Sequence, residues 1–316
     1  MSFIDRLRGK AATAAETGTA GRAGIVTRAA ARLAALPRWA MGILAALVAA
    51  MLYWGIGGIV VSDTDGDVTR RPGLDLLPPG GSVGIATAAM LIEDALDKGW
   101  TPDDSVLAPS ALLEDMPAFQ RGEHAVLVAF ARALNAAADG DPDLADAADA
   151  LGTAPDRGWL HGEFPFIGGS AEARYADAAE ALTRYNRALA DSGAPVGGAR
   201  RLALVLGAMD RALGQSQDGV AAIVDRSGGG SVDAQYHQVR GAAFASTMLL
   251  RGLRDDHAAI IRDRELAGAW VEAIDALDAI AGQSPFGPGR TDLVEQGYFL
   301  FRAREQLRVL GGGAMP

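Results

Sequence analysis

The sequence contains no cysteine, and aromatic residues make up only 6% of it. Without cysteine there is no thiol nucleophile, disulfide, cysteine-based zinc site or iron–sulfur cluster. The four histidines, His124, His161, His237 and His257, are each isolated in the sequence. A zinc site assembled from distant histidines stays open, but no motif indicates one. We therefore assign no metal-ligating residue from the sequence.

The motifs of common enzyme classes are also missing. There is no G-x-S-x-G nucleophile elbow, no Walker loop, no G-x-G-x-x-G and no H-E-x-x-H. Helical cell-wall lyases use one catalytic glutamate, for which we would expect a Glu-Ser pair at a helix end, and that dipeptide does not occur. The sequence thus provides no catalytic residue and no cofactor site, although an enzymatic activity is not excluded.

Acidic side chains outnumber basic ones except at the N-terminus. The formal net charge is -10, which disfavours nucleic acid as a partner because phosphate binding needs a basic surface. Residues 1–38 carry seven basic and two acidic side chains, a net charge of +5, and the chain beyond residue 61 carries -15. Between them, residues 39–61 carry no charge.

The uncharged run 39–61 predicts a single membrane-spanning helix. At 1.5 Å per residue it would extend about 34 Å, which is enough to cross a hydrocarbon core of about 30 Å. Trp39 lies at one end, and Tyr53 and Trp54 lie near the other, where aromatic rings favour the headgroup level. A cleaved signal peptide would have a shorter apolar core and a small-residue cleavage site. The charge contrast predicts a cytoplasmic leader, 1–38, and a periplasmic C-terminal domain at a bacterial inner membrane.

The remainder of the chain predicts an all-α domain. Residues 62–81 are rich in Gly, Pro and Asp and are predicted to be a linker. Across 82–310, apolar residues recur at helical spacing, and no segment alternates with period two. The predicted stripes are Ile85–Ala89–Ile92–Leu96, Phe119–Val126–Phe130–Ala133, Tyr175–Ala178–Leu182–Tyr185–Leu189, Leu202–Leu206–Met209–Leu213, Leu266–Trp270–Ala273–Leu277–Ile280 and Leu293–Leu300–Leu307–Leu310. Three glycines after Leu310 predict a loose tail, 311–316.

Four segments together carry a resemblance to a known family. They are PSALLEDMPAFQ at 109–120, SAEARY at 170–175 with Tyr185 and Asn186, RDREL at 262–266 with Trp270, and QGYFLFRAR at 296–304. In this order they resemble the proteobacterial single-pass inner-membrane proteins catalogued as domain-of-unknown-function family 2333. The resemblance covers most of the chain beyond the linker and implies an envelope location and a helical periplasmic domain. It transfers no activity, cofactor or catalytic residue.

Two segments are candidates for recognition. Residues 158–169 bring Trp159, His161, Glu163 and Phe166 together between two predicted helices, which is the composition of a recognition loop. The alternative is a loop whose aromatic side chains fill the core, and this is the commoner arrangement. Residues 262–265 could bind an anionic partner, although an ion network at a helix end is the commoner arrangement for such residues.

These observations predict a non-enzymatic, membrane-anchored binding or scaffold protein of the cell envelope, an accessory subunit of a larger complex. Its partners would be the lipid bilayer, through 39–61, and an envelope protein. Small residues at Ala45 and Ala49, or Ala46 and Ala50, are also compatible with a homo-oligomer. Two alternatives stay open. A helical receptor for an apolar ligand or lipid would need a closed cavity, and a hydrolase of envelope polymer would need a cleft with a buried glutamate of raised pKa.

Overall fold

The computed structural model describes residues 37, 41–49, 51, 66–102, 115–138, 140–157, 170–225, 230–285 and 288–315. The chain divides into two units, residues 1–55 and residues 56–316. In the first unit, residues 41–49 are helical, and the side chains of all nine are exposed. Among the described residues, no helix is both long enough and apolar enough to span a bilayer. The remainder of the predicted anchor, except Met51, lies outside the described residues.

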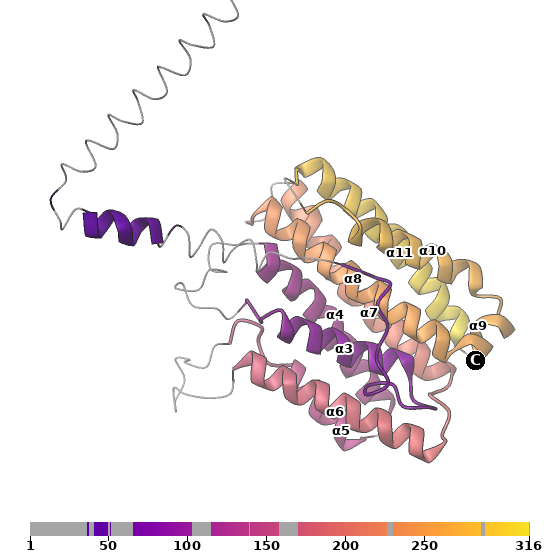
Figure 1. Ribbon diagram of the computed structural model, residues 1–316. Coiled ribbons are helices and arrows are strands. Elements are labelled where there is room, and N and C mark those ends of the chain that lie inside the picture. Colours follow the sequence, from indigo (N-terminus) through magenta and orange to yellow (C-terminus); the bar gives the residue numbers. More distant parts are fainter. Residues whose placement is uncertain are drawn as a thin grey trace, which may run out of the picture. The chain divides into compact units, whose positions relative to one another are not determined.

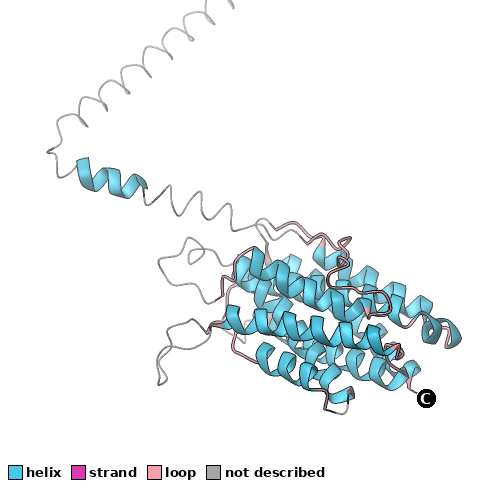
Figure 2. Cartoon of the chain, turned by 60° about the horizontal axis from the view of Figure 1, so that its bottom comes forward, coloured by secondary structure: helices cyan, strands magenta, loops and turns pink. Residues whose placement is uncertain are grey.

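The second unit consists of helices joined by loops, and no strand occurs in the part of the chain that is described (Figures 1 and 2). The all-α fold class predicted from the sequence is therefore confirmed. The helices are α3 (Val83–Asp97), α4 (Asp115–Ala137), α5 (Pro142–Leu151), α6 (Ala171–Ser192), α7 (Ala199–Val224), α8 (Val232–Asp256), α9 (Ala258–Asp263), α10 (Ala267–Ala281) and α11 (Arg290–Ala314).

Helix α8 lies at the centre of this unit. It packs against α3, α4, α7, α10 and α11, while α5 and α6 form a pair in which α6 packs on α3 and α5 packs on α4. The long helices run along one common direction (Figure 1). Helices α4, α6, α8 and α11 begin at the end of the bundle where α3, α5, α7 and α10 finish. Hydrogen bonds join these ends, such as Trp100 Nε1 to the Pro155 carbonyl at 2.8 Å and Tyr236 Oη to the Ser284 carbonyl at 2.7 Å.

Helix boundaries follow local chemistry that is legible in the sequence. Ser82, Ser170 and Ser231 each accept a hydrogen bond from the backbone N–H three residues later, which satisfies a donor that the first helical turn leaves open. Gly193 ends α6 in the left-handed conformation at φ 62°, where a side chain would be strained.

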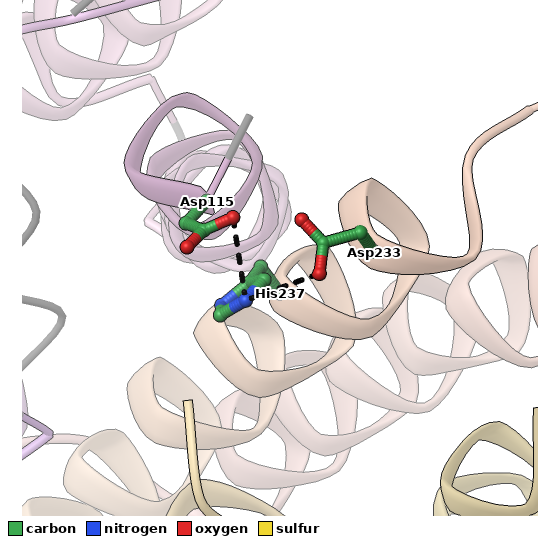
Figure 3. Close-up of side chains that lie close together, drawn as sticks. All are labelled: Asp115, Asp233 and His237. Carbon is green, nitrogen blue, oxygen red and sulfur yellow. Dashed lines mark ion pairs between the residues drawn. The ribbon is translucent and has the colours of Figure 1, made fainter. Parts of the chain in front are cut away.

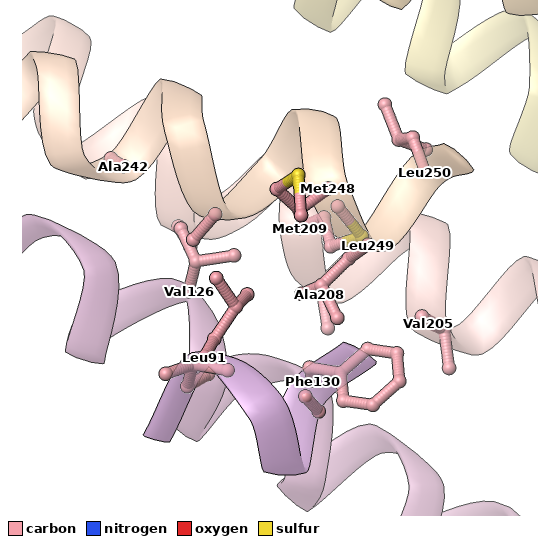
Figure 4. Close-up of a cluster of buried hydrophobic side chains, with 14 of the residues drawn as sticks. Leu91, Val126, Phe130, Val205, Ala208, Met209, Ala242, Met248, Leu249 and Leu250 are labelled. Carbon is pink, nitrogen blue, oxygen red and sulfur yellow. The ribbon is translucent and has the colours of Figure 1, made fainter. Parts of the chain in front are cut away.

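The core is made by the apolar stripes of α3, α4, α7 and α10 together with α8, which is buried on nearly all sides. Phe130 and Val126 of α4 meet Met209 of α7 and Leu249 of α8 in its middle (Figure 4). Trp270 of α10 is completely buried, and its indole N–H donates to the Leu250 carbonyl at 3.1 Å. Burial of this much aliphatic and aromatic surface is the main stabilising contribution to the domain.

Two glycines allow α4 and α8 to touch backbone to backbone. A Cβ atom on Gly122 would lie 1.9 Å from the Gln238 carbonyl oxygen, and one on Gly241 would lie 1.9 Å from the Phe119 carbonyl oxygen. Contacts this short exclude any side chain at either position. The crossing fixes α4 on α8 and brings the first turns of both helices together.

Residues 66–81, within the predicted linker, pack against the helices. Leu76 is buried, and Val68 and Leu77 pack on the core. Arg251 of α8 donates to the Val68 carbonyl, and Arg70 forms an ion pair with Asp94 at 2.6 Å. A few apolar side chains and arginines are therefore enough to hold this Gly- and Pro-rich segment on the domain.

Helix α11 continues through Gly311, Gly312 and Gly313 to Ala314. The prediction of a loose tail at 311–316 is therefore wrong for residues 311–314. Ala314 is buried. Arg264 donates to the Gly313 carbonyl at 3.0 Å and also to the Met315 carbonyl. Each glycine disfavours a helix by about 1 kcal/mol, and these hydrogen bonds to the last carbonyl groups offset part of that.

Candidate functional site

The first turns of α4 and α8 bring together one histidine and two aspartates (Figure 3). His237 Nε2 lies 3.6 Å from Oδ1 of Asp115 and 4.0 Å from Oδ1 of Asp233. The His237 side chain is 0% exposed, whereas Asp115 and Asp233 are 35% and 41% exposed. We call these three residues the His237 cluster. It consists of a buried imidazole that faces two partly exposed carboxylates.

Local helix chemistry explains where each member stands. Asp115 and Asp233 lie in the first turns of α4 and α8, where the helix dipole stabilises a carboxylate. His237 follows Asp233 by four residues, so both lie on one face of α8. Asp115 reaches them because α4 and α8 cross closely at Gly122 and Gly241.

Burial and neighbouring charges set the protonation of the cluster. Burial is the main reason that the pKa of His237 is lowered, and the charge of Arg240 adds to this, while Asp233 and the Pro285 backbone oppose it. The pKa of Asp233 is raised, first by burial and then by its hydrogen bond with Asp115 and the charge of that residue. The neutral imidazole is thus favoured at neutral pH, and Asp233 keeps its proton to a higher pH than an ordinary aspartate does.

Arg240 lies on the other edge of the His237 ring. Its guanidinium Nη1 lies 3.5 Å from Nδ1 of His237, and its Nη2 donates to the Ala281 carbonyl at 3.3 Å. Arg240 is buried, and burial lowers the pKa of its guanidinium. The charge of Asp115 opposes this shift in part. By contrast, Nε2 of His237 has no hydrogen-bond partner among the described residues.

A second pair of buried ionisable groups lies further along α4. Burial raises the pKa of Glu123 to about 8, and the charge of Lys98 opposes the shift. Burial lowers the pKa of His124 to about 4, although its Nε2 lies 2.9 Å from the Leu151 carbonyl oxygen. The cavity beside Glu123 has a volume of about 20 Å³, room for about one water molecule. Glu123 therefore has the pKa that a hydrolase alternative requires, but this cavity cannot hold a sugar ring.

Helices α4 and α7 form an open groove of about 510 Å³. Its floor is mostly alanine, and the exposed Arg132 and Arg211 line it. The receptor alternative requires a closed, dry cavity, and this groove is open to solvent along the two helices.

The outer face of α11 carries large apolar side chains that are exposed. Val294, Tyr298, Phe301 and Val309 are 51–57% exposed, and their spacing places them on one side of the helix. The opposite side is buried through Leu293, Leu300, Leu307 and Leu310. Helix α11 is thus apolar on two faces, of which only one is covered by the domain. We call the four exposed residues the α11 stripe.

The candidate recognition residues Trp159, His161, Glu163 and Phe166 lie outside the described residues. The residues that flank this segment are joined, because the Ala171 N–H donates to the Arg157 carbonyl at 2.8 Å. The other candidate, 262–265, lies where the ion-network interpretation places it, at a helix end. Arg262 pairs with Asp263 at 3.4 Å, and Arg264 caps the C-terminus of α11.

The sequence did not indicate the His237 cluster. Asp233 and His237 have the i, i+4 spacing of two residues on one helix face, which is a weak signal by itself because acids in a first helical turn are common. Asp115 could be added only once the crossing of α4 and α8 is known.

The chain matches no protein-family model, no curated protein and no solved structure. The resemblance to the inner-membrane family therefore stays a prediction from the sequence.

Proposed function

We propose that this chain is a membrane-anchored binding protein of the bacterial envelope, acting as a scaffold or accessory subunit rather than as an enzyme. Residues 39–61 anchor it in the inner membrane, residues 1–38 lie in the cytoplasm, and the helical domain lies in the periplasm. The charge contrast across 39–61 supports this orientation. The exposed apolar side chains of Ile43, Leu47 and Val48 support a lipid environment for this helix.

The observation that carries the binding function is the α11 stripe. Exposed apolar residues scattered singly are ordinary, but Val294, Tyr298 and Phe301 follow one another on one face of α11, and such a surface favours contact with another protein. The ion pair of Glu305 with Arg308 lies between Phe301 and Val309 on that face. Tyr298 and Phe301 are half exposed, so each presents roughly 100 Å² for burial by a partner. Aromatic residues of this kind are the usual energetic centres of interfaces.

The partner that best fits the stripe is an amphipathic helix of another membrane-held envelope protein. The steps of four and three from Val294 to Tyr298 and on to Phe301 match the anchors used when one helix lies against another. Arg302 lies with its guanidinium carbon 6.0 Å from the centre of the Tyr298 ring and has no ion pair among the described residues. A carboxylate beside the apolar face of the partner helix would pair with it.

The size of the stripe argues for a tethered partner over a second copy of the chain. The stripe presents well under the roughly 800 Å² per partner that a standard interface buries. Two copies meeting through this stripe alone would therefore form only a weak dimer. Two proteins anchored in one membrane meet at high effective concentration, so a modest interface is sufficient.

Variants of the stripe test this proposal in native membranes. Crosslinking of the full chain should give an adduct that is lost in Tyr298→Glu and Phe301→Glu. The matched control is Leu74→Glu, because Leu74 is an apolar residue that is 85% exposed and lies outside the stripe. Peptide mapping of the adduct should identify an amphipathic helix of a different protein. An adduct that survives both stripe variants, or one that contains a second copy of this chain, would overturn the proposal.

A further inference from the structure

We propose that Asp115, Asp233 and His237 bind one divalent transition-metal ion, with Zn²⁺ as the favoured ion. The site goes beyond the binding function of α11, because it lies where α4 and α8 begin and shares no residue with the stripe. Three potential ligand atoms, one imidazole nitrogen and two carboxylate oxygens, lie within 4.8 Å of one another.

The orientation of His237 points to a ligand rather than to an ordinary acidic surface. Its side chain is 0% exposed, and Nε2 has no hydrogen-bond partner among the described residues. A buried polar nitrogen without a hydrogen-bond partner is unfavourable. This nitrogen faces the two carboxylates (Figure 3), so an ion between the three groups would satisfy it.

The distances suit a shared ion. Two ligand atoms about 2.1 Å from one tetrahedral ion lie about 3.4 Å apart. The separations of 3.6 Å and 4.0 Å from His237 Nε2 to the two aspartate oxygens are a few tenths of an ångström longer. Small rotations of the partly exposed Asp115 and Asp233 side chains would close that difference. The ion would also relieve the repulsion between the two carboxylates.

The type of donor selects the ion. Calcium and magnesium prefer sites made of oxygen alone, whereas zinc readily combines an imidazole nitrogen with carboxylate oxygens. Three protein ligands leave a fourth position of a tetrahedral zinc ion for water. The exposed sides of Asp115 and Asp233 open that position to solvent. The ion would join the first turns of α4 and α8.

Arg240 provides the competing explanation, in which the aspartates only balance a buried cation. It contacts the Nδ1 edge of His237, however, while both carboxylates gather at the Nε2 edge. If the carboxylates only balanced the charge of Arg240, they would not both need to lie at Nε2 of His237, which has no hydrogen-bond partner among the described residues.

Calorimetric titration of the full chain with ZnCl₂, after chelator treatment and dialysis, tests the site. The wild-type chain should bind one Zn²⁺ and melt at a higher temperature in its presence, because a ligand that binds only the folded state stabilises it. Asp115→Asn and Asp233→Asn keep the side-chain shape and should each weaken binding by at least about tenfold. His237→Gln should abolish binding.

Controls separate loss of a ligand from general damage. His257→Gln changes another buried histidine, and Asp218→Asn changes an exposed acid on α7, so both should bind Zn²⁺ within about twofold of wild type. If His237→Gln does not fold, the two partly exposed aspartate positions decide the question. No binding by the wild-type chain, or equal binding by the wild-type chain and both asparagine variants, would overturn the site.

Discussion

Gly122 of α4 and Gly241 of α8 lie where the two helices cross, and each faces the backbone of the other helix. A Cβ atom at either position would lie 1.9 Å from a carbonyl oxygen across the crossing, from Gln238 or from Phe119. Glycine at these two positions therefore determines how closely α4 and α8 approach. The same approach brings Asp115 to His237.

Alanine at the crossing should destabilise the domain. In Gly122→Ala or Gly241→Ala the added methyl group would collide with the backbone of the other helix, so α4 and α8 would have to move apart. We expect each substitution to lower the free energy of unfolding by about 3 kcal/mol or more. At roughly 2–4 °C per kcal/mol, the melting temperature should fall by several degrees. Gly268→Ala is the matched control, because this helical glycine has nothing within 4 Å of the added methyl and should gain up to about 1 kcal/mol. Equal melting of Gly122→Ala and Gly268→Ala would show that the helices are further apart.

Asp256 should contribute much more stability than its neighbour Asp255. Asp256 accepts hydrogen bonds from the Val83 N–H at 2.7 Å, the Gly84 N–H at 2.9 Å and the Ser82 hydroxyl at 2.7 Å, so it caps α3 from the end of α8. Asp256→Ala should cost about 1–3 kcal/mol, because two helix-terminal donors lose a charged acceptor.

Asp255→Ala is the control, since this exposed carboxylate forms only surface ion pairs, with Arg71 at 3.4 Å and with Arg254 at 3.9 Å, and should contribute less than about 1 kcal/mol. Chemical denaturation of both variants measures the difference. Equal losses would mean that Asp256 does not hold the start of α3.

Glu123 should make the stability of the domain fall as pH rises. Its folded pKa of about 8 lies above the ordinary value of 4.5, so between these values the folded state holds a proton that the unfolded state has released. The stabilising contribution is complete below about pH 4.5 and is lost as pH rises through about 8. Glu123→Gln should match wild type near pH 4 and exceed its stability by on the order of 3 kcal/mol at pH 7.

Urea denaturation midpoints from pH 4 to pH 8 measure this effect. Glu180→Gln is the control, because Glu180 is exposed on α6. Parallel pH profiles for wild type and Glu123→Gln would contradict a buried, protonated Glu123.

Trp159→Ala distinguishes the two interpretations of residues 158–169. If Trp159 contacts a partner, the melting temperature should stay nearly unchanged while formation of the crosslinked adduct falls. If the indole fills the core, truncation should cost about 3–5 kcal/mol. That cost corresponds to roughly 2–4 °C per kcal/mol in a thermal scan. A drop of this size would end the recognition-loop interpretation.

The sequence predicted most helices because their apolar residues recur on one face. The stripes that include Phe130, Met209 and Trp270 all lie in the core, as expected. Helix α8 gave no such stripe, because it is buried almost all round from Tyr236 to Leu250 and therefore lacks a polar face. Residues 66–81 were predicted to be part of a linker because of their Gly, Pro and Asp content. Composition alone cannot show that Leu76 is buried in the core.

The functional features were harder to predict than the fold. The His237 cluster depends on a contact between α4 and α8, and sequence spacing carries no information about contacts between distant helices. The α11 stripe was present in the sequence, but Tyr298 and Phe301 can be recognised as exposed only when Leu300 and Leu307 are seen to face the core.

A photo-crosslinking scan along α11 tests the central claim most directly. A photoreactive phenylalanine analogue placed singly at positions 294, 298, 301 and 309 of the full chain in native membranes should give high yields of one adduct with a different protein. The same analogue at positions 74 and 218, which are exposed but lie outside the stripe, should give little of it. High yields at the four α11 positions together with low yields at 74 and 218 would confirm that a partner covers this face. Equal yields at all six positions, or adducts made only of two copies of this chain, would contradict the account.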